Sequence, residues 1–179
     1  LLRQLTTTLD LYVAPEHRAA VAERAGDRLL ALARAAEPGS DTQLQLVKAV
    51  AARAASTTLL DAVAGLLDGS APLAGLSVDT DLRWELLTGL VAGGRAGDAE
   101  ITAQLAEDPT ATGERAAAAA RAATPTAQAK AAAWSAVHGG GLANAVQAST
   151  IAGFARAHDR TLLEPWVEPY FATLEQVWT

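Results

Sequence analysis

Apolar residues recur along this chain at the three- and four-residue spacing of amphipathic helices, in segments that end at glycine or proline. The first long segment begins at Pro15 and ends at Pro38-Gly39, and the next begins at Ser40. Gln43 stands three residues after Ser40, which completes a capping-box pattern. Because sustained period-two alternation is missing from the sequence, the pattern predicts an all-α protein.

Two further segments show the apolar stripe of a single helix face. The first carries Leu59 to Leu67, with Ser56 as the expected cap and Gly69 as the stop. The second begins near Asp79, where negative charge suits a helix start, and it ends at Gly93-Gly94. Its apolar residues are Leu82, Leu86, Leu87, Leu90 and Val91.

The second half of the chain predicts shorter helices separated by glycine or proline signals. They are a helix around Ile101 and Leu105, one from Pro109 through the alanines 116–120, one opened by Thr124-Pro125, one over 142–154, and a last stretch with apolar residues at Leu163, Val167, Tyr170, Leu174 and Val177. Pro165 and Pro169 interrupt the last stretch, which favours a short turn followed by a helix starting near Pro169.

Successive helices joined by short connectors are typical of antiparallel helical hairpins stacked side by side. We therefore expect a HEAT-like α-solenoid that forms a single helical-repeat domain over residues 1–179. The spacing between helices is irregular, so a compact irregular bundle remains the structural alternative.

Composition narrows the possible functions of these helices. The 179 residues include no cysteine, which removes disulfides, thiolate nucleophiles and thiolate metal sites. A net charge of -6 with scattered arginines argues against nucleic-acid binding. No apolar run approaches the roughly 20 residues that cross a bilayer, so we expect no membrane partner and a cytoplasmic location. The chain opens on Leu1 and contains no methionine, which suggests a fragment of a larger protein.

Residues that could support catalysis do not form a recognisable set. A zinc peptidase helix needs two histidines one turn apart with a glutamate between them, whereas His17, His138 and His158 stand far from one another. The run 139–141 of glycines lacks the lysine and hydroxyl residue of a phosphate-binding loop, so we interpret it as a connector. Pairs of carboxylates lie where helices begin or end, and there the helix dipole explains them.

Arg83 and Trp84 are the most interesting polar and aromatic neighbours. A helix that buries Leu82, Leu86 and Leu90 turns these two residues toward its flank or its other face. An arginine beside a tryptophan can hold a carboxylate or stack on a peptide. The alternative is structural, with Arg83 paired to Asp79 one turn away and Trp84 packed on the neighbouring repeat.

Several segments resemble one known family in the same order along the chain. The stretches are 38–44, 79–87 with the wording Asp-Thr-Asp-Leu-Arg-Trp-Glu-Leu-Leu, 108–115, 142–154 and 165–171. They resemble the C-terminal domain of actinobacterial-type aminopeptidase N, and the resemblance runs from about Gln4 to the last residue. It implies a HEAT-like helical domain that follows a β domain and a thermolysin-like zinc domain.

The resemblance implies a non-catalytic role for this chain. The zinc-binding and substrate-amine motifs of the family have no counterpart here, so no catalytic residue and no metal ligand is transferred. Zinc is expected in an absent catalytic domain, the parent protein is expected to be a zinc metalloaminopeptidase, and the fragment itself needs no cofactor. The implied partners are that catalytic domain and a peptide substrate, which the helical domain would enclose as a lid and chamber wall.

Some relatives place arginines on the chamber wall, whereas the helix from Asn144 offers Gln147 and no arginine before Arg156. The candidates for facing the substrate are therefore Arg83, Trp84, Asn144 and Gln147. The competing function is an independent α-solenoid scaffold that binds a partner protein along its concave face.

Overall fold

A computed structural model of the chain describes residues 1–177, with side chains through Leu174. Within this part the regular structure consists of ten α-helices, one π-helix and two short 3-10 helices, without a β-strand. The prediction of an all-α protein is therefore confirmed. Val177, which we placed in the last apolar stretch, has a side chain outside the described residues.

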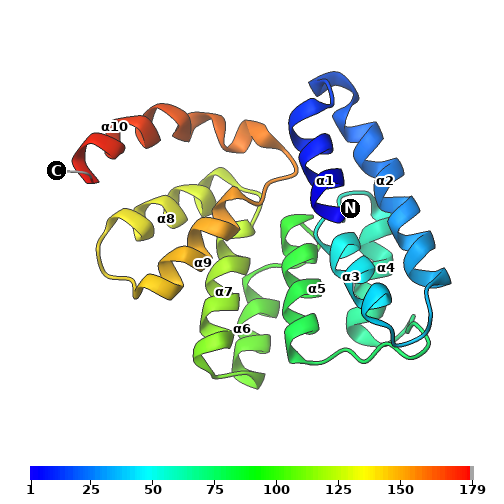
Figure 1. The fold of residues 1–179 in the computed structure, drawn as a ribbon. Coiled ribbons are helices and arrows are strands. Elements are labelled where there is room, and N and C mark those ends of the chain that lie inside the picture. Colours follow the sequence, from blue (N-terminus) through cyan, green and yellow to red (C-terminus); the bar gives the residue numbers. More distant parts are fainter. Residues whose placement is uncertain (178–179) are drawn as a thin grey trace. The chain divides into compact units, whose positions relative to one another are not determined.

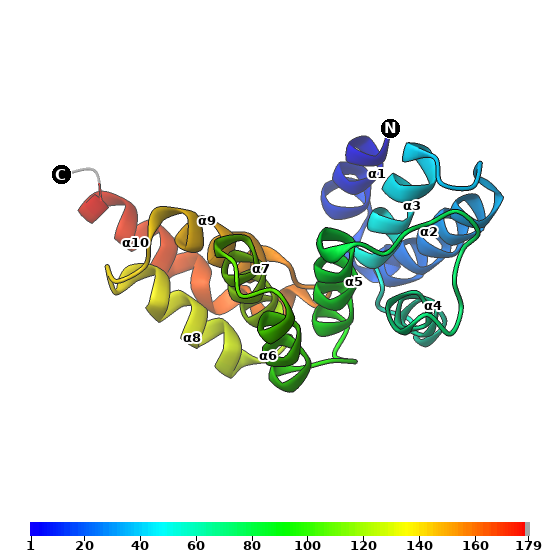
Figure 2. The same ribbon diagram turned by 90° about the horizontal axis from the view of Figure 1, so that it is seen from below.

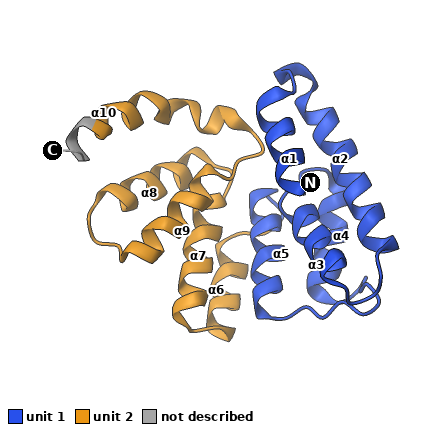
Figure 3. Cartoon of the chain, in the orientation of Figure 1, with its two compact units in different colours: residues 1–95 blue, residues 96–179 orange. Residues whose placement is uncertain are grey.

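The chain forms two compact units, Leu1–Arg95 and Ala96–Thr179 (Figure 3). The first unit contains α1 (Leu2–Thr7), the π-helix η1 (Thr8–Tyr12), α2 (Pro15–Ala35), α3 (Asp41–Ala51), α4 (Thr57–Asp68) and α5 (Thr80–Ala92). The second unit contains α6 (Asp98–Glu107), α7 (Ala111–Ala123), α8 (Ala127–His138), α9 (Asn144–Ala155), η2 (Arg160–Leu162), η3 (Glu164–Trp166) and α10 (Val167–Val177). The HEAT-like stacking of one domain over 1–179 stays a prediction.

Side-chain caps begin α3, α4 and α5 where the sequence predicted them. Ser40 accepts a hydrogen bond from the backbone N–H of Gln43, and Ser56 accepts one from that of Leu59. Asp79 does the same for Leu82, with an Oδ1 to N distance of 2.8 Å. Each cap satisfies an N–H that the first helical turn leaves without an intrahelical partner.

Gln43 departs in one detail from the capping box. Its Oε1 accepts a hydrogen bond from the backbone N–H of Gly39, because the N–H of Ser40 already donates to the carbonyl of Glu37. Its Nε2 donates to the carbonyl of Ala74, in the loop before α5. The buried amide therefore joins the start of α3 to a loop more than 30 residues away, which the sequence pattern did not indicate.

The core of the first unit centres on α5. Leu82, Leu86 and Leu90 are buried, which confirms the apolar stripe of this helix. Trp84 is also buried, with 4% of its surface exposed, so α5 is covered on more than the one face that the stripe indicates. Helices α3 and α4 pack against α5, and α2 packs mainly against α3.

The second unit is organised around the contact between α7 and α9, the most extensive contact between helices in the chain. Figures 1 and 2 both show these two helices side by side, with α6 and α8 as their neighbours. Gly153 of α9 lies so close to the carbonyl of Ala119 in α7 that a Cβ there would overlap it. Small residues therefore let the two backbones approach each other closely.

The helices of the second unit begin close to their predicted positions. Thr110 and Thr126 cap α7 and α8 one or two residues after the predicted signals at Pro109 and Thr124-Pro125. The last helix begins at Val167, two residues before Pro169, and the two 3-10 turns precede it. At the other end of the chain, α1 and η1 are helical segments that the sequence pattern did not predict.

We predict that Gly153→Ala lowers the free energy of unfolding by about 2 kcal/mol, because α7 and α9 must separate to admit the methyl group. Helix propensity alone predicts the opposite sign, a gain of up to about 1 kcal/mol. Gly141→Ala is the matched control, since a Cβ there meets nothing within 4 Å. Urea unfolding of both variants measures the difference, and a stable Gly153→Ala protein would contradict the close contact.

Candidate functional site

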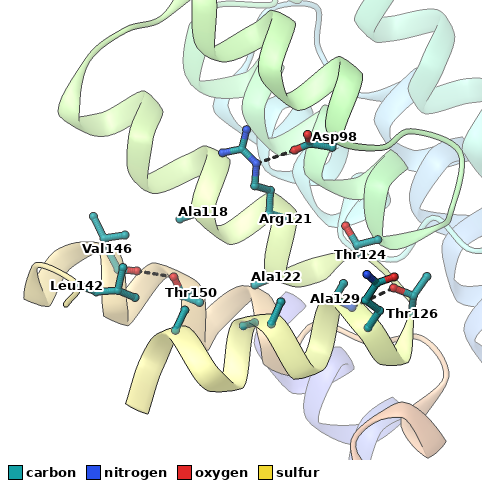
Figure 4. Close-up of a pocket in the computed structure, with 14 residues that line it drawn as sticks. Asp98, Ala118, Arg121, Ala122, Thr124, Thr126, Ala129, Leu142, Val146 and Thr150 are labelled. Carbon is teal, nitrogen blue, oxygen red and sulfur yellow. Dashed lines mark hydrogen bonds and ion pairs between the residues drawn. The ribbon is translucent and has the colours of Figure 1, made fainter. Parts of the chain in front are cut away.

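An open groove lies in the second unit between α7, α8 and α9, with a volume of about 610 Å³ (Figure 4). Its floor consists mainly of alanines from α7 and α8, namely Ala118, Ala122, Ala129, Ala132, Ala133 and Ala136. Leu142, Val146 and Thr150 form the side that belongs to α9 and the loop before it. The groove exists because methyl side chains leave space where longer ones would fill the angle between the helices.

Polar residues border this apolar floor. Arg121 donates from Nε to Asp98 at 2.7 Å and from Nη2 to the hydroxyl of Thr102 at 3.1 Å. Both charged side chains are largely exposed, so their pair contributes less than about 1 kcal/mol to stability. Thr124, Thr126 and Gln128 continue the border along the start of α8. The groove can therefore accept an apolar group while offering hydrogen bonds at its edge.

Helix α8 has a second face, which carries Lys130, Trp134 and His138 at successive helical turns. Lys130 is fully buried. Its ammonium donates to the carbonyls of Ala122 at 2.7 Å, Phe154 at 2.9 Å, Arg156 at 3.2 Å and Gly153 at 3.5 Å. These carbonyls belong to the C-terminal ends of α7 and α9, which carry partial negative charge.

Burial of the Lys130 ammonium lowers its pKa from 10.5 to about 8, because a charged group loses its hydration inside the protein. The carbonyl oxygens act in the opposite sense, since they stabilise the charged form. At neutral pH the side chain is therefore an ammonium ion that is solvated by the backbone instead of by water. The ring of Phe154 lies 5.6 Å from Nζ and adds a cation–π contact.

Aromatic rings continue this face of α8 toward the C-terminal segment. Trp134 stacks on His138 with ring centroids 4.2 Å apart and on Trp166 of η3 with centroids 5.1 Å apart. Phe154 contacts both tryptophans at about 6 Å. Through Trp166 the cluster attaches the segment after α9 to α8. The ring of His138 belongs to this cluster because it stacks on Trp134.

Two of the predicted candidates, Arg83 and Trp84, lie on α5 in the first unit. Arg83 is half-buried and donates from Nη1 to the carbonyl of Leu67 at 3.3 Å. Trp84 is buried, and the hydroxyl of Thr88 donates to its backbone carbonyl at 2.7 Å. The alternative in which Trp84 packs on a neighbouring repeat stays a prediction.

The other two candidates, Asn144 and Gln147, lie in the first turn of α9 in the second unit. Asn144 is exposed. Gln147 is half-buried and donates from Nε2 to the carbonyl of Val137 at 2.9 Å, near the end of α8. Both residues stand in the same turn as Val146, which lines the groove, although neither lines it.

Sequence reasoning missed the groove and the buried lysine. One signal was available, because Lys130, Trp134 and His138 share one face of a helix that is otherwise mostly alanine. A lysine at such spacing is ordinarily exposed, so only the carbonyls that α7 and α9 bring together identify its role.

Neither a metal centre nor a membrane span is found in the part of the chain that the structure describes. No group of three or more histidine, cysteine, aspartate or glutamate side chains within residues 1–177 could hold a metal ion. None of the helices described there is long and apolar enough to cross a bilayer.

The described fold and groove can be compared with known proteins. A family of proteins described as the ERAP1-like C-terminal domain matches the chain over residues 1–179. The chain is also similar to the aminopeptidase N of Streptomyces lividans, with 48% identity over 177 residues. That alignment covers 98% of this chain but 21% of the relative, in its C-terminal part. The chain therefore spans about a fifth of the length of this relative.

We predict that Lys130 makes the stability of the chain rise with pH between about 8 and 10.5. The folded-state pKa is the lower one, so the unfolded state binds more protons in this window and deprotonation favours folding. The full gain is about 3 kcal/mol. Urea unfolding of wild type and Lys130→Met at pH 7.5, 9 and 10 checks this, since other groups cancel in the difference. A difference that stays constant with pH would contradict the lowered pKa.

Proposed function

Because the chain belongs to the ERAP1-like C-terminal domain family, we propose that it is the non-catalytic C-terminal domain of an aminopeptidase N-type zinc peptidase, where it encloses the peptide substrate. The observation that carries this proposal is the agreement over the whole chain with the C-terminal part of a bacterial aminopeptidase N. The chain is a C-terminal domain of an aminopeptidase N-like protein. From this we propose its role as a lid and chamber wall.

In this proposal the reaction occurs in a catalytic domain of the same parent chain. Zinc bound there would polarise the scissile carbonyl and lower the pKa of a water molecule. Among the residues that the structure describes, no group of three or more histidine, cysteine, aspartate or glutamate side chains could hold a metal ion, and the proposal places the steps of the reaction in the catalytic domain. The contribution of the described residues is to bind, to orient and to exclude water around the peptide.

The groove of the second unit suits this role chemically. Its alanine floor accepts an apolar side chain of a peptide, and its polar border offers hydrogen bonds to the peptide backbone. Weak, general contacts of this kind retain peptides of many sequences, as a chamber wall requires. The partners that follow are the parent's catalytic domain and a peptide. A HEAT-like stacking of the helices and a cytoplasmic location belong to the same proposal.

Arg83, Trp84, Asn144 and Gln147 remain candidates for substrate contact. Asn144 is the most accessible of them, whereas Arg83 and Gln147 already donate to backbone carbonyls within their own units. The independent scaffold that the sequence left open is not favoured, because the similarity is to a part of an enzyme chain.

We predict that filling the groove impairs binding of peptides but not the chemistry. In the intact parent enzyme, Ala132→Trp should raise KM for peptides of about ten residues at least fivefold and leave kcat/KM for an aminoacyl arylamide unchanged. Ala132 is exposed on the groove floor, so the indole ring of the variant occupies the open groove and does not displace atoms of the core. Ala148→Trp is the control, because Ala148 is exposed on α9 and does not line the groove. Equal effects of the two variants would refute a role of the groove in peptide binding.

We predict that α5 stabilises the chain through Leu86 far more than through Arg83. Leu86 is fully buried, so Leu86→Ala should lower the free energy of unfolding by about 2 to 5 kcal/mol. Arg83→Ala should lower it by about 1 kcal/mol, since the hydrogen bond from the half-buried guanidinium to the carbonyl of Leu67 is lost. Chemical unfolding of the chain measures both values, and KM for long peptides is measured with Arg83→Ala in the parent enzyme. We expect that KM to be unchanged, and a large rise would instead place the guanidinium against the peptide.

A further inference from the structure

The second unit contains a fully buried cation whose ammonium group donates to four backbone carbonyls. The ammonium of Lys130 is surrounded by the carbonyl oxygens of Ala122, Gly153, Phe154 and Arg156, at 2.7 to 3.5 Å from Nζ. We call these four oxygens the carbonyl cage. Backbone carbonyls at such distances can replace the hydration shell of a monovalent cation.

The cage is built by the ends of two helices. Ala122 belongs to the last turn of α7, Gly153 and Phe154 belong to the last turn of α9, and Arg156 caps α9. Carbonyls at helix C-termini lack the intrahelical partners of a helix interior. The carbonyl of Gly153 also accepts from the backbone N–H of Arg156, whereas Lys130 donates to those of Ala122, Phe154 and Arg156. Their partial negative charges converge on one point and make that point favourable for a cation.

The cage also stands where the C-terminal segment leaves α9. Arg156 is the residue at which the helix ends, and ten residues later Trp166 of η3 stacks on Trp134. Lys130 and Trp134 lie one turn apart on α8. The ammonium and the indole therefore hold the two ends of one connecting stretch against the same helix.

We propose that the carbonyl cage is a binding site for a primary ammonium group, which the chain fills with its own Lys130, and that this occupancy fastens the segment after α9 to α8. The site selects hydrogen-bond donors, since a side chain of equal length that ends in a methyl group leaves the carbonyls of Ala122, Phe154 and Arg156 without the donor that Lys130 provides. Lys130 is in this sense a positioning residue for the C-terminal segment.

The absence of cysteine from the chain makes a direct test possible. The Lys130→Cys variant carries a single thiol, which is alkylated in denaturant so that burial does not block the reagent. With 2-bromoethylamine the thiolate displaces bromide and gives a side chain that matches lysine atom for atom, apart from sulfur in place of a methylene. With 1-bromopropane it gives the same length and ends in a methyl group. Wild type taken through the same steps controls for refolding.

We expect the ammonium adduct to have a folding equilibrium constant close to that of wild type, measured by urea unfolding at pH 7. The propyl adduct should have a folding equilibrium constant smaller by about 100-fold or more. A propyl adduct of equal or greater stability would overturn the proposal, because it would show that desolvation of the ammonium outweighs its hydrogen bonds. Failure of the ammonium adduct to refold, while wild type refolds, would overturn it as well.

Limited trypsin digestion tests the fastening of the segment separately from global stability. In the propyl adduct, cleavage after Arg156 and Arg160 should be at least about tenfold faster than in the ammonium adduct, measured by mass spectrometry under conditions in which both are folded. Cleavage after the exposed Arg95 is the internal control and should be similar in the two proteins. Equal rates after Arg156 and Arg160 would show that the cage does not hold the segment.

Discussion

The second unit depends on how a single buried ammonium ion is solvated. Lys130 leaves water completely, and four carbonyls from the ends of α7 and α9 take the place of its hydration shell. An isolated charge in this position would be strongly unfavourable, and unsatisfied carbonyls would be unfavourable as well. The ammonium group supplies donors to the carbonyls, and the carbonyls supply acceptors to the ammonium group. This exchange requires the middle of α8 to lie beside the C-terminal ends of α7 and α9.

The groove follows from the same arrangement. With α8 held by Lys130 on one face, its alanine face lies opposite α9, and the small side chains there leave the space open. Gly153 brings α9 close to α7. A wall made of methyl groups with a polar border accepts many peptides weakly, which fits an accessory domain whose parent chain supplies the chemistry elsewhere.

The two units have cores of different composition, although glycine lets α5 approach α3 in the first unit as it lets α9 approach α7 in the second. In the first, leucines and valines of α3, α4 and α5 form a conventional core, and the buried amide of Gln43 joins the start of α3 to a distant loop. In the second, alanine and glycine allow close approach, so specificity comes from a lysine and from the aromatic cluster around Trp134. Small side chains interlock weakly, so they do not by themselves fix how the helices are arranged. A directional polar contact such as that of Lys130 specifies one arrangement.

The sequence by itself determined the helical class, most helix boundaries and the family resemblance, because caps, glycine stops and apolar spacing act over three or four residues. Ser40, Ser56 and Asp79 cap their helices as expected for that reason. Only the tertiary structure decided that Trp84 is buried, that Gln147 donates to α8 and that Lys130 lies inside. The hydrogen bonds of Gln147 and Lys130 reach carbonyls 8 to 26 residues away, and no local pattern records which distant groups will meet.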